Sequence, residues 1–344
     1  MIWPRRTIRL ILKKLQHPTL WWFQDNRQAM SYSLNSLYEV VGVSKQAVHQ
    51  AKKRQEAFDL EVSELVILAD QLKEEHPGCG VEKMYYTLRP SFMGRDQFCE
   101  IFMELGYGVK RVSNYHRTTY SGAYIYPNLI EGMGIKRPFQ VIQSDITYFH
   151  LNGEHYYLVF IIDVYTRLVV GYAVNENLRT EGNIAAMKMA LKIMNYQSWG
   201  LIHHSDRGSQ YSSKEYTCLL KENHIHISMG TVAWENPYAE RINGIIKNEY
   251  LKRWQIKDLK DLKKKVGKAV EHYNTKRLHR AFKMKFTPMG FYQKLVHLSA
   301  QERPTVIVYT EGKKNFEGAS SPYEVCPREE PLAHDCPMEI LNEC

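Results

Sequence analysis

The sequence predicts an α/β protein in which a mixed-sheet core follows an all-α region. Apolar residues recur at helical spacing before about residue 113, whereas β-rich segments begin after Pro138. In this second part three strands come first, and a helix, a strand, a helix, a strand and a helix follow them. A doubly wound dinucleotide-binding fold would alternate strand and helix strictly, so this order indicates a mixed sheet instead.

Composition and charge narrow the class of protein. The chain has 344 residues, of which 44% are hydrophobic, and no apolar run approaches the roughly 18 residues that a membrane span needs. Six cysteines without zinc-like spacing indicate free thiols in a reducing cytosol. The net charge is +9, and residues 241–285 carry 15 Lys and Arg against 4 Asp and Glu. This basic segment favours a polyanionic partner.

The all-α region contains a helix-turn-helix pattern over residues 34–60, after a basic extension at 1–33. A first helix is expected to end at Gly42, and Ser44 is expected to cap a second. A plain helical hairpin is the alternative. The predicted DNA contacts of this pattern are Lys45, Gln46, Lys52 and Lys53. A second helical module is predicted at 61–113, and a linker at 114–137.

The mixed-sheet core is predicted at residues 138–292. The expected strands cover 139–151, 155–167, 168–175, 200–206 and 225–230, and the expected helices cover 180–196, 212–224 and about 236 to beyond 252. Residues 293–344 form a C-terminal tail, which is predicted to be largely disordered after about residue 312.

Three carboxylates fall at significant positions of these elements. Asp145 lies in the first strand, Asp206 follows the fourth, and Glu240 lies in the first turns of the long helix. If the two strands are neighbours, their backbones are about 4.8 Å apart, and two aspartates at matching height can share one cation. Oxygen ligands alone suit Mg²⁺ or Mn²⁺ rather than zinc. Two such ions would activate a water or a 3′-hydroxyl for attack on a phosphodiester.

The helix that carries Glu240 supports this interpretation. Asn243 and Lys247 lie on the same side of it as Glu240, where they add an amide and a phosphate-binding cation. A solvated helix face is the alternative for this side of the helix.

Five segments occur in order along the core: VIQSDITYF, YYLVFIIDVYTRLVVGYAV, HHSDRGSQYSS, SMGTVAWENPYAERINGIIKNEYL and HYNTKRLHRAFKMKFTPMGFY. Together they resemble the integrase core (DDE, rve) of bacterial insertion-sequence transposases of the OrfB type, whose catalytic domain is similar to retroviral integrase. The earlier segment HPGCGVEKMYYTL is similar to the second helix-turn-helix module of those proteins. The resemblance covers roughly residues 34–292.

The resemblance implies an RNase-H-like fold and a DDE triad of Asp145, Asp206 and Glu240. It also implies metal-dependent cleavage at the ends of an insertion element and transfer of the freed 3′-hydroxyl to another phosphodiester. The implied partners are double-stranded DNA, both element ends and target, and further copies of the chain on that DNA. The implied location is the bacterial cytoplasm, in association with the nucleoid.

One departure from the family concerns the third acid. The interval between Asp206 and Glu240 holds 33 residues, which is slightly shorter than is usual in the family. Glu235 and Glu249 are rival third acids, although the pattern ENPYAER favours Glu240. The shortened loop leaves open a second function, a DNA-binding regulator or transposase remnant that no longer cuts. A third, an RNase H nuclease acting on RNA hybrids, is disfavoured by the helix-turn-helix pattern.

Other polar residues near the triad have competing interpretations. Asp163 is expected to cap a turn, and His204 to support Asp206 rather than to bind a metal. Trp234 and Tyr238 either stack on an unpaired base or pack in the core. Phosphate contacts are predicted, against the alternative of a solvated surface, for Arg207, Lys276, Arg277 and Arg280.

Overall fold

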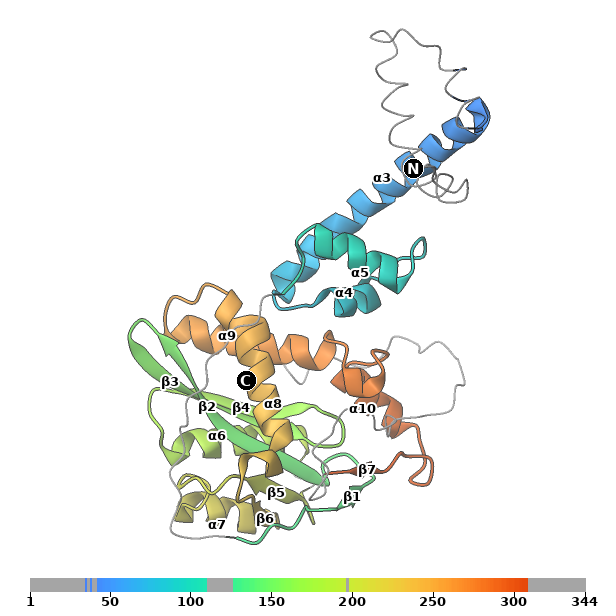
Figure 1. The fold of residues 1–344 in the computed structure, drawn as a ribbon. Coiled ribbons are helices and arrows are strands. Elements are labelled where there is room, and N and C mark those ends of the chain that lie inside the picture. Colours follow the sequence, from blue (N-terminus) through green and yellow to red (C-terminus); the bar gives the residue numbers. More distant parts are fainter. Residues whose placement is uncertain (1–34, 36–37, 39–41, 110–125, 196–197, 309–344) are drawn as a thin grey trace, which may run out of the picture. The chain divides into compact units, whose positions relative to one another are not determined.

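The computed structural model describes residues 35, 38, 42–109, 126–195 and 198–308 (Figure 1). The chain divides into two compact units. The N-terminal unit contains the chain up to Gly108 except for His76–Gly78, and the core unit contains His76–Gly78 together with the chain from Val109 onward. The described helices include none that is long and apolar enough to cross a membrane.

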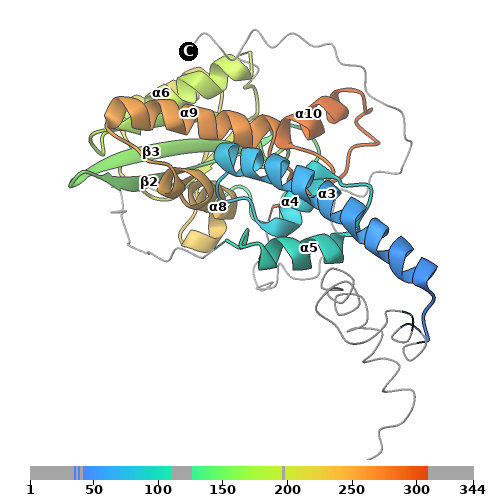
Figure 2. The same ribbon diagram turned by 90° about the horizontal axis from the view of Figure 1, so that it is seen from above.

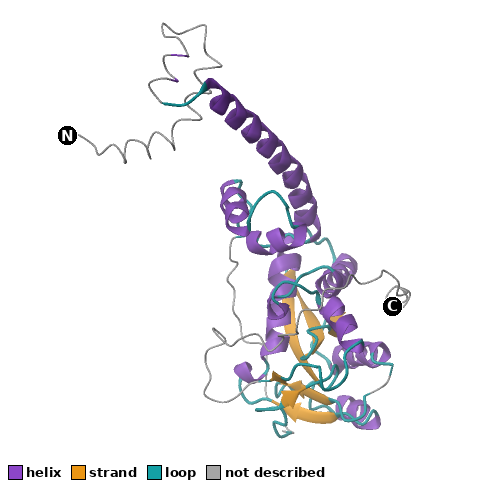
Figure 3. Ribbon diagram, turned by 90° about the vertical axis from the view of Figure 1, so that its right-hand side faces the viewer, coloured by secondary structure: helices purple, strands orange, loops and turns teal. Residues whose placement is uncertain are grey.

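The N-terminal unit consists of helices α3 (Lys45–Glu75), α4 (Val81–Leu88) and α5 (Arg95–Glu104). Ser44 caps α3 as predicted, because its Oγ accepts a hydrogen bond from the amide of Ala47 at 3.1 Å. The expected helix before Gly42 lies mostly outside the described residues. α3 continues without a break past residue 60, so the two predicted modules share one long helix (Figure 3). The unit has its own apolar core, formed by Leu65, Ala69, Met84, Phe98 and Phe102 among others.

The core unit is built on a five-stranded mixed sheet with strand order β4-β3-β2-β5-β6. β3 is antiparallel to β2 and β4, whereas β5 is parallel to both β2 and β6. This arrangement confirms the predicted RNase-H-like mixed sheet. The strands are β2 (Val141–Leu151), β3 (Glu154–Asp163), β4 (Val169–Asn175), β5 (Ile202–Ser205) and β6 (His226–Met229).

Alternating apolar residues bury both faces of this sheet. Val159 and Ile161 of β3 pack with α6 (Thr180–Ile193) and α7 (Lys214–Glu222). Leu158, Phe160 and Ile162 point the other way and pack with α8 (Pro237–Ile245) and α9 (Leu259–Thr275). The sheet therefore has helices on both faces. The helices α6, α8 and α9 can be found by their labels in Figure 2.

The structure adds elements that the sequence did not indicate. After α8 the chain forms a π-helical turn (Ile246–Tyr250) and a 3₁₀ turn (Leu251–Arg253). α10 (Pro288–Val296) follows α9, and β1 (Gly134–Ile135) pairs with β7 (Val306–Ile307). These two strands lie in the predicted linker and tail. The tail predicted to be disordered after residue 312 lies outside the described residues.

Ser213 is the N-cap of α7, because its side chain accepts the amide of Tyr216 at 3.3 Å.

Candidate active site

The register of the sheet places two of the predicted acids side by side. In the parallel β2–β5 pair, Gln143 lies opposite His204. Continued by two residues, this register sets Asp145 of β2 opposite Asp206, which lies one residue past the end of β5. The premise that the first and fourth strands are neighbours is therefore confirmed.

The N-terminus of α8 is attached to β2 by two hydrogen bonds. The Nδ2 of Asn236, the N-cap residue, donates to the carbonyl of Ser144 at 2.9 Å. The amide of Tyr238 donates to Oε1 of Gln143 at 3.0 Å. These contacts involve the residues just before Asp145, so α8 begins beside that strand and carries Glu240 in its first turn. Sequence reasoning missed Asn236 and Gln143, although an Asn-Pro pair at a helix start was a usable signal.

The charges of the three acids act on one another. Burial, and to a smaller extent the charges of Asp206 and then Glu240, together raise the pKa of Asp145 to about 8. Burial also raises the pKa of Glu240, again with a contribution from Asp206. Where the charge of one carboxylate raises the pKa of another, added positive charge, either a proton or a cation, is stabilising.

Local hydrogen bonds orient the two aspartates. Asn243 Nδ2 donates to Asp145 Oδ2 at 2.8 Å, and the amide of Ile146 donates to Oδ1 at 2.9 Å. The amide of Gly208 donates to Asp206 Oδ1 at 3.0 Å. Asn243 was predicted to lie on the same side of the helix as Glu240, and its partner in the structure is Asp145.

Lys247 lies on the same side of the helix and reaches back to β2. Its Nζ donates to Oγ1 of Thr147 at 2.5 Å, and it lies 5.5 Å from the centre of the Tyr148 ring. Burial and the nearby Lys252 lower the pKa of Lys247, whereas Asp145 opposes this shift. The cation is therefore held close to the strand that carries Asp145.

The short loop before α8 is closed by one of the rival acids. The carboxylate of Glu235, in the 3₁₀ turn Ala233–Glu235, accepts the amide of Thr231. Arg207 Nη2 donates to Oγ1 of Thr231 at 2.6 Å, which ties the loop after β5 to the same point. Glu235 thus acts as a loop cap, and the shortened interval is accommodated before the helix begins.

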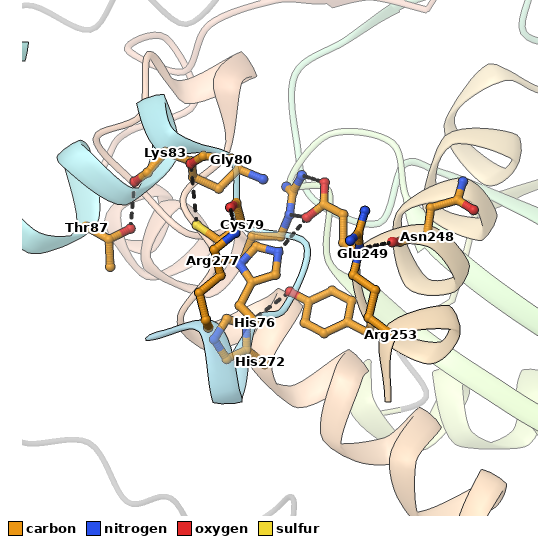
Figure 4. A network of polar contacts seen from close by, with 12 residues as sticks. His76, Cys79, Gly80, Lys83, Thr87, Asn248, Glu249, Arg253, His272 and Arg277 are labelled. Carbon is orange, nitrogen blue, oxygen red and sulfur yellow. Dashed lines mark hydrogen bonds and ion pairs between the residues drawn. The ribbon is translucent and has the colours of Figure 1, made fainter. Parts of the chain in front are cut away.

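The other rival acid, Glu249, is engaged in an ion-pair cluster. Arg277 donates to both of its oxygens at 2.8 Å, and His76 Nε2 lies 2.6 Å from Oε2 (Figure 4). The side chain of Arg277 is only 8% exposed. The predicted phosphate contact of Arg277 is therefore wrong, because its guanidinium is buried against a carboxylate. Its neighbours Lys276 and Arg280 are exposed.

The predicted supporting residues have defined surroundings. His204 is buried, its Nδ1 lies 2.8 Å from Ser228 Oγ, and burial lowers its pKa to about 4. The partner of this nitrogen is therefore Ser228 on β6, and support of Asp206 stays a prediction. The turn-capping role of Asp163 is confirmed, because its Oδ2 accepts the amide of Thr166 at 2.9 Å.

The two aromatic residues near Glu240 differ from each other. The Arg167 guanidinium lies 3.9 Å from the centre of the Tyr238 ring, and the Tyr238 hydroxyl donates to the carbonyl of Val308, which favours packing. Trp234 is 49% exposed, so base stacking stays a prediction for this residue. On α3, the predicted DNA contacts Lys45, Gln46 and Lys53 are exposed and Lys52 is half-buried.

The donor set bears on which metal could bind. Within the part of the chain that the structure describes, no three His, Cys, Asp or Glu side chains are grouped closely enough to hold a metal ion as they stand. Asp145, Asp206 and Glu240 nevertheless offer oxygen donors alone, and the charge of Asp206 raises the pKa values of the other two. This chemistry fits a hard divalent cation such as Mg²⁺ or Mn²⁺.

Two comparisons relate the sequence to known families. Two family models, both described as integrase core domain, match the chain. The first matches residues 135–233 and the second matches residues 221–288. An "insertion element IS600 uncharacterized 31 kDa protein" of Shigella sonnei is 30% identical over 214 residues, which cover 60% of this chain and 78% of that protein. The transposase for IS629 of the same organism is 34% identical over 145 residues, 42% of this chain and 48% of that protein. The chain thus spans about half of the IS629 transposase.

A comparison with solved structures matches a viral protein. The HTLV-2 integrase catalytic core domain, determined in complex with magnesium, is 22% identical, with a TM-score of 0.37. The match covers 45% of this chain and 97% of the viral domain.

Proposed function

Because this chain belongs to the insertion-sequence transposases with an integrase core domain, we propose that it cuts DNA at the ends of an insertion element and joins them to target DNA. In this proposal Asp145, Asp206 and Glu240 form the catalytic triad. The observation that carries it is the mutual electrostatic effect of these carboxylates, which contributes to the raised pKa of Asp145. The family membership supports transposition over a regulator that does not cut.

The three carboxylates are proposed to hold two divalent ions, Mg²⁺ or Mn²⁺. When bound, such ions supply a nucleophile activated at neutral pH and stabilise the leaving oxygen of the phosphodiester. The protein's own groups set the donors in place: Asn243 and the amide of Ile146 orient the Asp145 carboxylate, and the amide of Gly208 orients Asp206. Each carboxylate keeps lone pairs for a metal, because every oxygen accepts more than one bond.

DNA binding is proposed to involve cations around this site. Lys247, held at Thr147, lies beside the triad and would contact a phosphate next to the scissile bond. Arg207 on the closing loop, with Lys276 and Arg280 at the surface, would add phosphate contacts. The exposed residues of α3 are proposed to bind the element ends, and several copies of the chain are proposed to assemble on them.

The proposal is tested with the full chain and a plasmid that carries its coding region with the flanking genomic DNA. Incubation with Mg²⁺ or Mn²⁺ should produce cuts at the borders of the element, mapped by sequencing. Asp206→Asn should abolish these cuts and leave binding to the same DNA nearly unchanged. Wild-type protein that binds the borders but never cuts them would contradict the proposal, as would equal cutting by the variant.

A further inference from the structure

The π-helical turn Ile246–Tyr250 is the most unusual backbone feature beside the triad. π turns are rare, because their wider hydrogen-bond pattern is less favourable than that of the α-helix, and they occur mostly as single turns inserted into α-helices. Such a turn needs side-chain contacts that hold it. Two charged residues of this turn, Lys247 and Glu249, make such contacts with different parts of the core.

The two residues point in nearly opposite directions, as expected for positions two apart on a helix. Lys247 reaches β2, where its Nζ meets Thr147 Oγ1. Thr147 lies two residues beyond Asp145 on the strand, and so on the same face of the sheet. Glu249 reaches Arg277, which follows α9. The turn is thus fixed from both sides.

The contacts of Glu249 are stronger than one surface ion pair. Arg277 grips both carboxylate oxygens in a bidentate arrangement, the strongest geometry for this pair. Burial lowers the pKa of Arg277, and its bonds to Glu249 more than offset this effect, so the cation persists. His76 adds a third contact at 2.6 Å, and its ring stacks on Tyr250, the last residue of the turn, at 4.7 Å between ring centres.

The backbone of the segment His76–Gly78 also binds this turn. The amide of Gly78 donates to the carbonyl of Glu249 at 2.8 Å. A Cβ at position 78 would lie 2.3 Å from the Cα of Glu249 and 2.7 Å from its carbonyl oxygen, so only glycine allows this approach. Figure 4 shows His76 and Arg277 meeting at Glu249, and His272 beside them. His272 Nδ1 in turn lies 3.0 Å from the hydroxyl of Tyr250.

We infer that His76–Gly78 and Arg277 together form a clamp on Glu249 that positions Lys247 beside Asp145. Glu249 and Arg277 are positioning residues in this inference and touch neither DNA nor metal. The importance of Lys247 for cutting rests on the proposed function, whereas its placement by the clamp does not. The core is therefore completed by a tripeptide that precedes α4 in the chain.

The placement of Lys247 is measured by its rate of acetylation with acetic anhydride in the full-length protein, followed by mass spectrometry. Lys247 in the wild-type protein should react slowly, because its Nζ is bonded to Thr147. Glu249→Gln and Arg277→Lys should each raise the rate at Lys247 severalfold. The exposed Lys188 on α6 serves as an internal reference and should not change.

Two further variants separate the clamp from a general loss of folding. Gly78→Ala keeps every charge of the clamp but prevents the close approach, and it should also expose Lys247. Lys265→Ala removes a surface ion pair with Asp261 and should leave Lys247 unchanged. The inference is overturned if Lys247 reacts at the wild-type rate in Glu249→Gln, Arg277→Lys and Gly78→Ala. It is equally overturned if all lysines, Lys188 included, become faster together in these three variants.

A cutting assay on the plasmid with its genomic borders then tests the link to activity. If the clamp acts through Lys247, Glu249→Gln should lower the cutting rate in the wild-type background and have no further effect once Lys247→Ala is present. Equal losses in both backgrounds would overturn the inference and leave the proposed function intact. A Lys247→Ala variant that cuts normally would remove Lys247 from the proposed function, while the acetylation result would still decide its placement.

Discussion

Two glutamates on one continuous helical segment have opposite electrostatic surroundings. Glu240, in the first turn of α8, faces Asp206 and Asp145, and its pKa is raised. Glu249, in the π turn, faces the Arg277 guanidinium and the His76 ring. In the first region carboxylates face other carboxylates, whereas in the second a carboxylate is paired with a buried guanidinium. The difference supports the proposal that Glu240, and not Glu249, is the third metal ligand.

The largest expected effect separates the two regions by chemistry. Asp206→Asn removes a proposed metal ligand. The rate at which the protein cuts the plasmid with the flanking genomic DNA should therefore fall by about 10³-fold, which is about 4 kcal/mol of activation free energy. Its free energy of unfolding should stay the same or rise, because one repelling charge is lost. Gel-based cutting rates and urea denaturation measure the two quantities. A variant that loses stability in proportion to activity would contradict the contrast.

The second effect tests stability. Glu249→Gln leaves the buried Arg277 guanidinium without its counter-charge, which should lower the free energy of unfolding by about 3 kcal/mol. Glu240→Gln changes the same residue type nine positions earlier and should cost less than about 0.5 kcal/mol, because the charge of Asp206 repels that of Glu240. Urea denaturation of both variants measures the difference. Equal losses would mean that the two glutamates are not in opposite surroundings.

The third effect concerns pH and metal removal. The pKa of Asp145 is about 8 in the folded protein, above its ordinary value of 3.8. The folded protein therefore keeps a proton that the unfolded chain releases between these values, so without metal the stability should fall as the pH rises from 4 to 8. The melting temperature in EDTA should show this decline, and Asp145→Asn should flatten it.

Addition of a divalent cation should change how the melting temperature depends on pH. Mg²⁺ binding competes with the proton on Asp145, so addition of Mg²⁺ should raise the melting temperature more at pH 8.5 than at pH 5.5. The same addition should have little effect in Asp206→Asn. A rise that is independent of pH, or equal in this variant, would place metal binding elsewhere in the chain.

The sequence predicted one of these regions and misassigned the other, for a physical reason. The sequence set Asp145 and Asp206 at matching heights on the condition that their strands are neighbours, and the pairing of β2 with β5 meets that condition. Arg277, in contrast, lies in a run of cations that resembles a phosphate-binding surface. Its partner Glu249 lies 28 residues away and His76 lies 173 residues from that glutamate, so no local pattern reveals the cluster.

Short and irregular elements were also beyond prediction. β1 and β7 contain two residues each, too few to show a period. All five strands of the main sheet lie between them in the sequence. The π turn follows an ordinary helical pattern in the sequence, because its altered spacing depends on tertiary contacts at Lys247 and Glu249. The predicted helix was therefore right in extent and incomplete in geometry.

The smallest expected effect compares neighbours within the segment that holds Arg277. Lys276 is exposed, so Lys276→Ala should change the free energy of unfolding by less than about 0.5 kcal/mol. If Lys276 binds phosphate, its loss should weaken binding to a duplex of random sequence and reduce the dependence of log affinity on log salt concentration by about one unit. Fluorescence anisotropy at several salt concentrations measures this slope. Arg277→Met should do the reverse, with lower stability and an unchanged slope when measured where the variant is folded. An unchanged slope in Lys276→Ala would show that the exposed cation next to the clamp does not contact DNA.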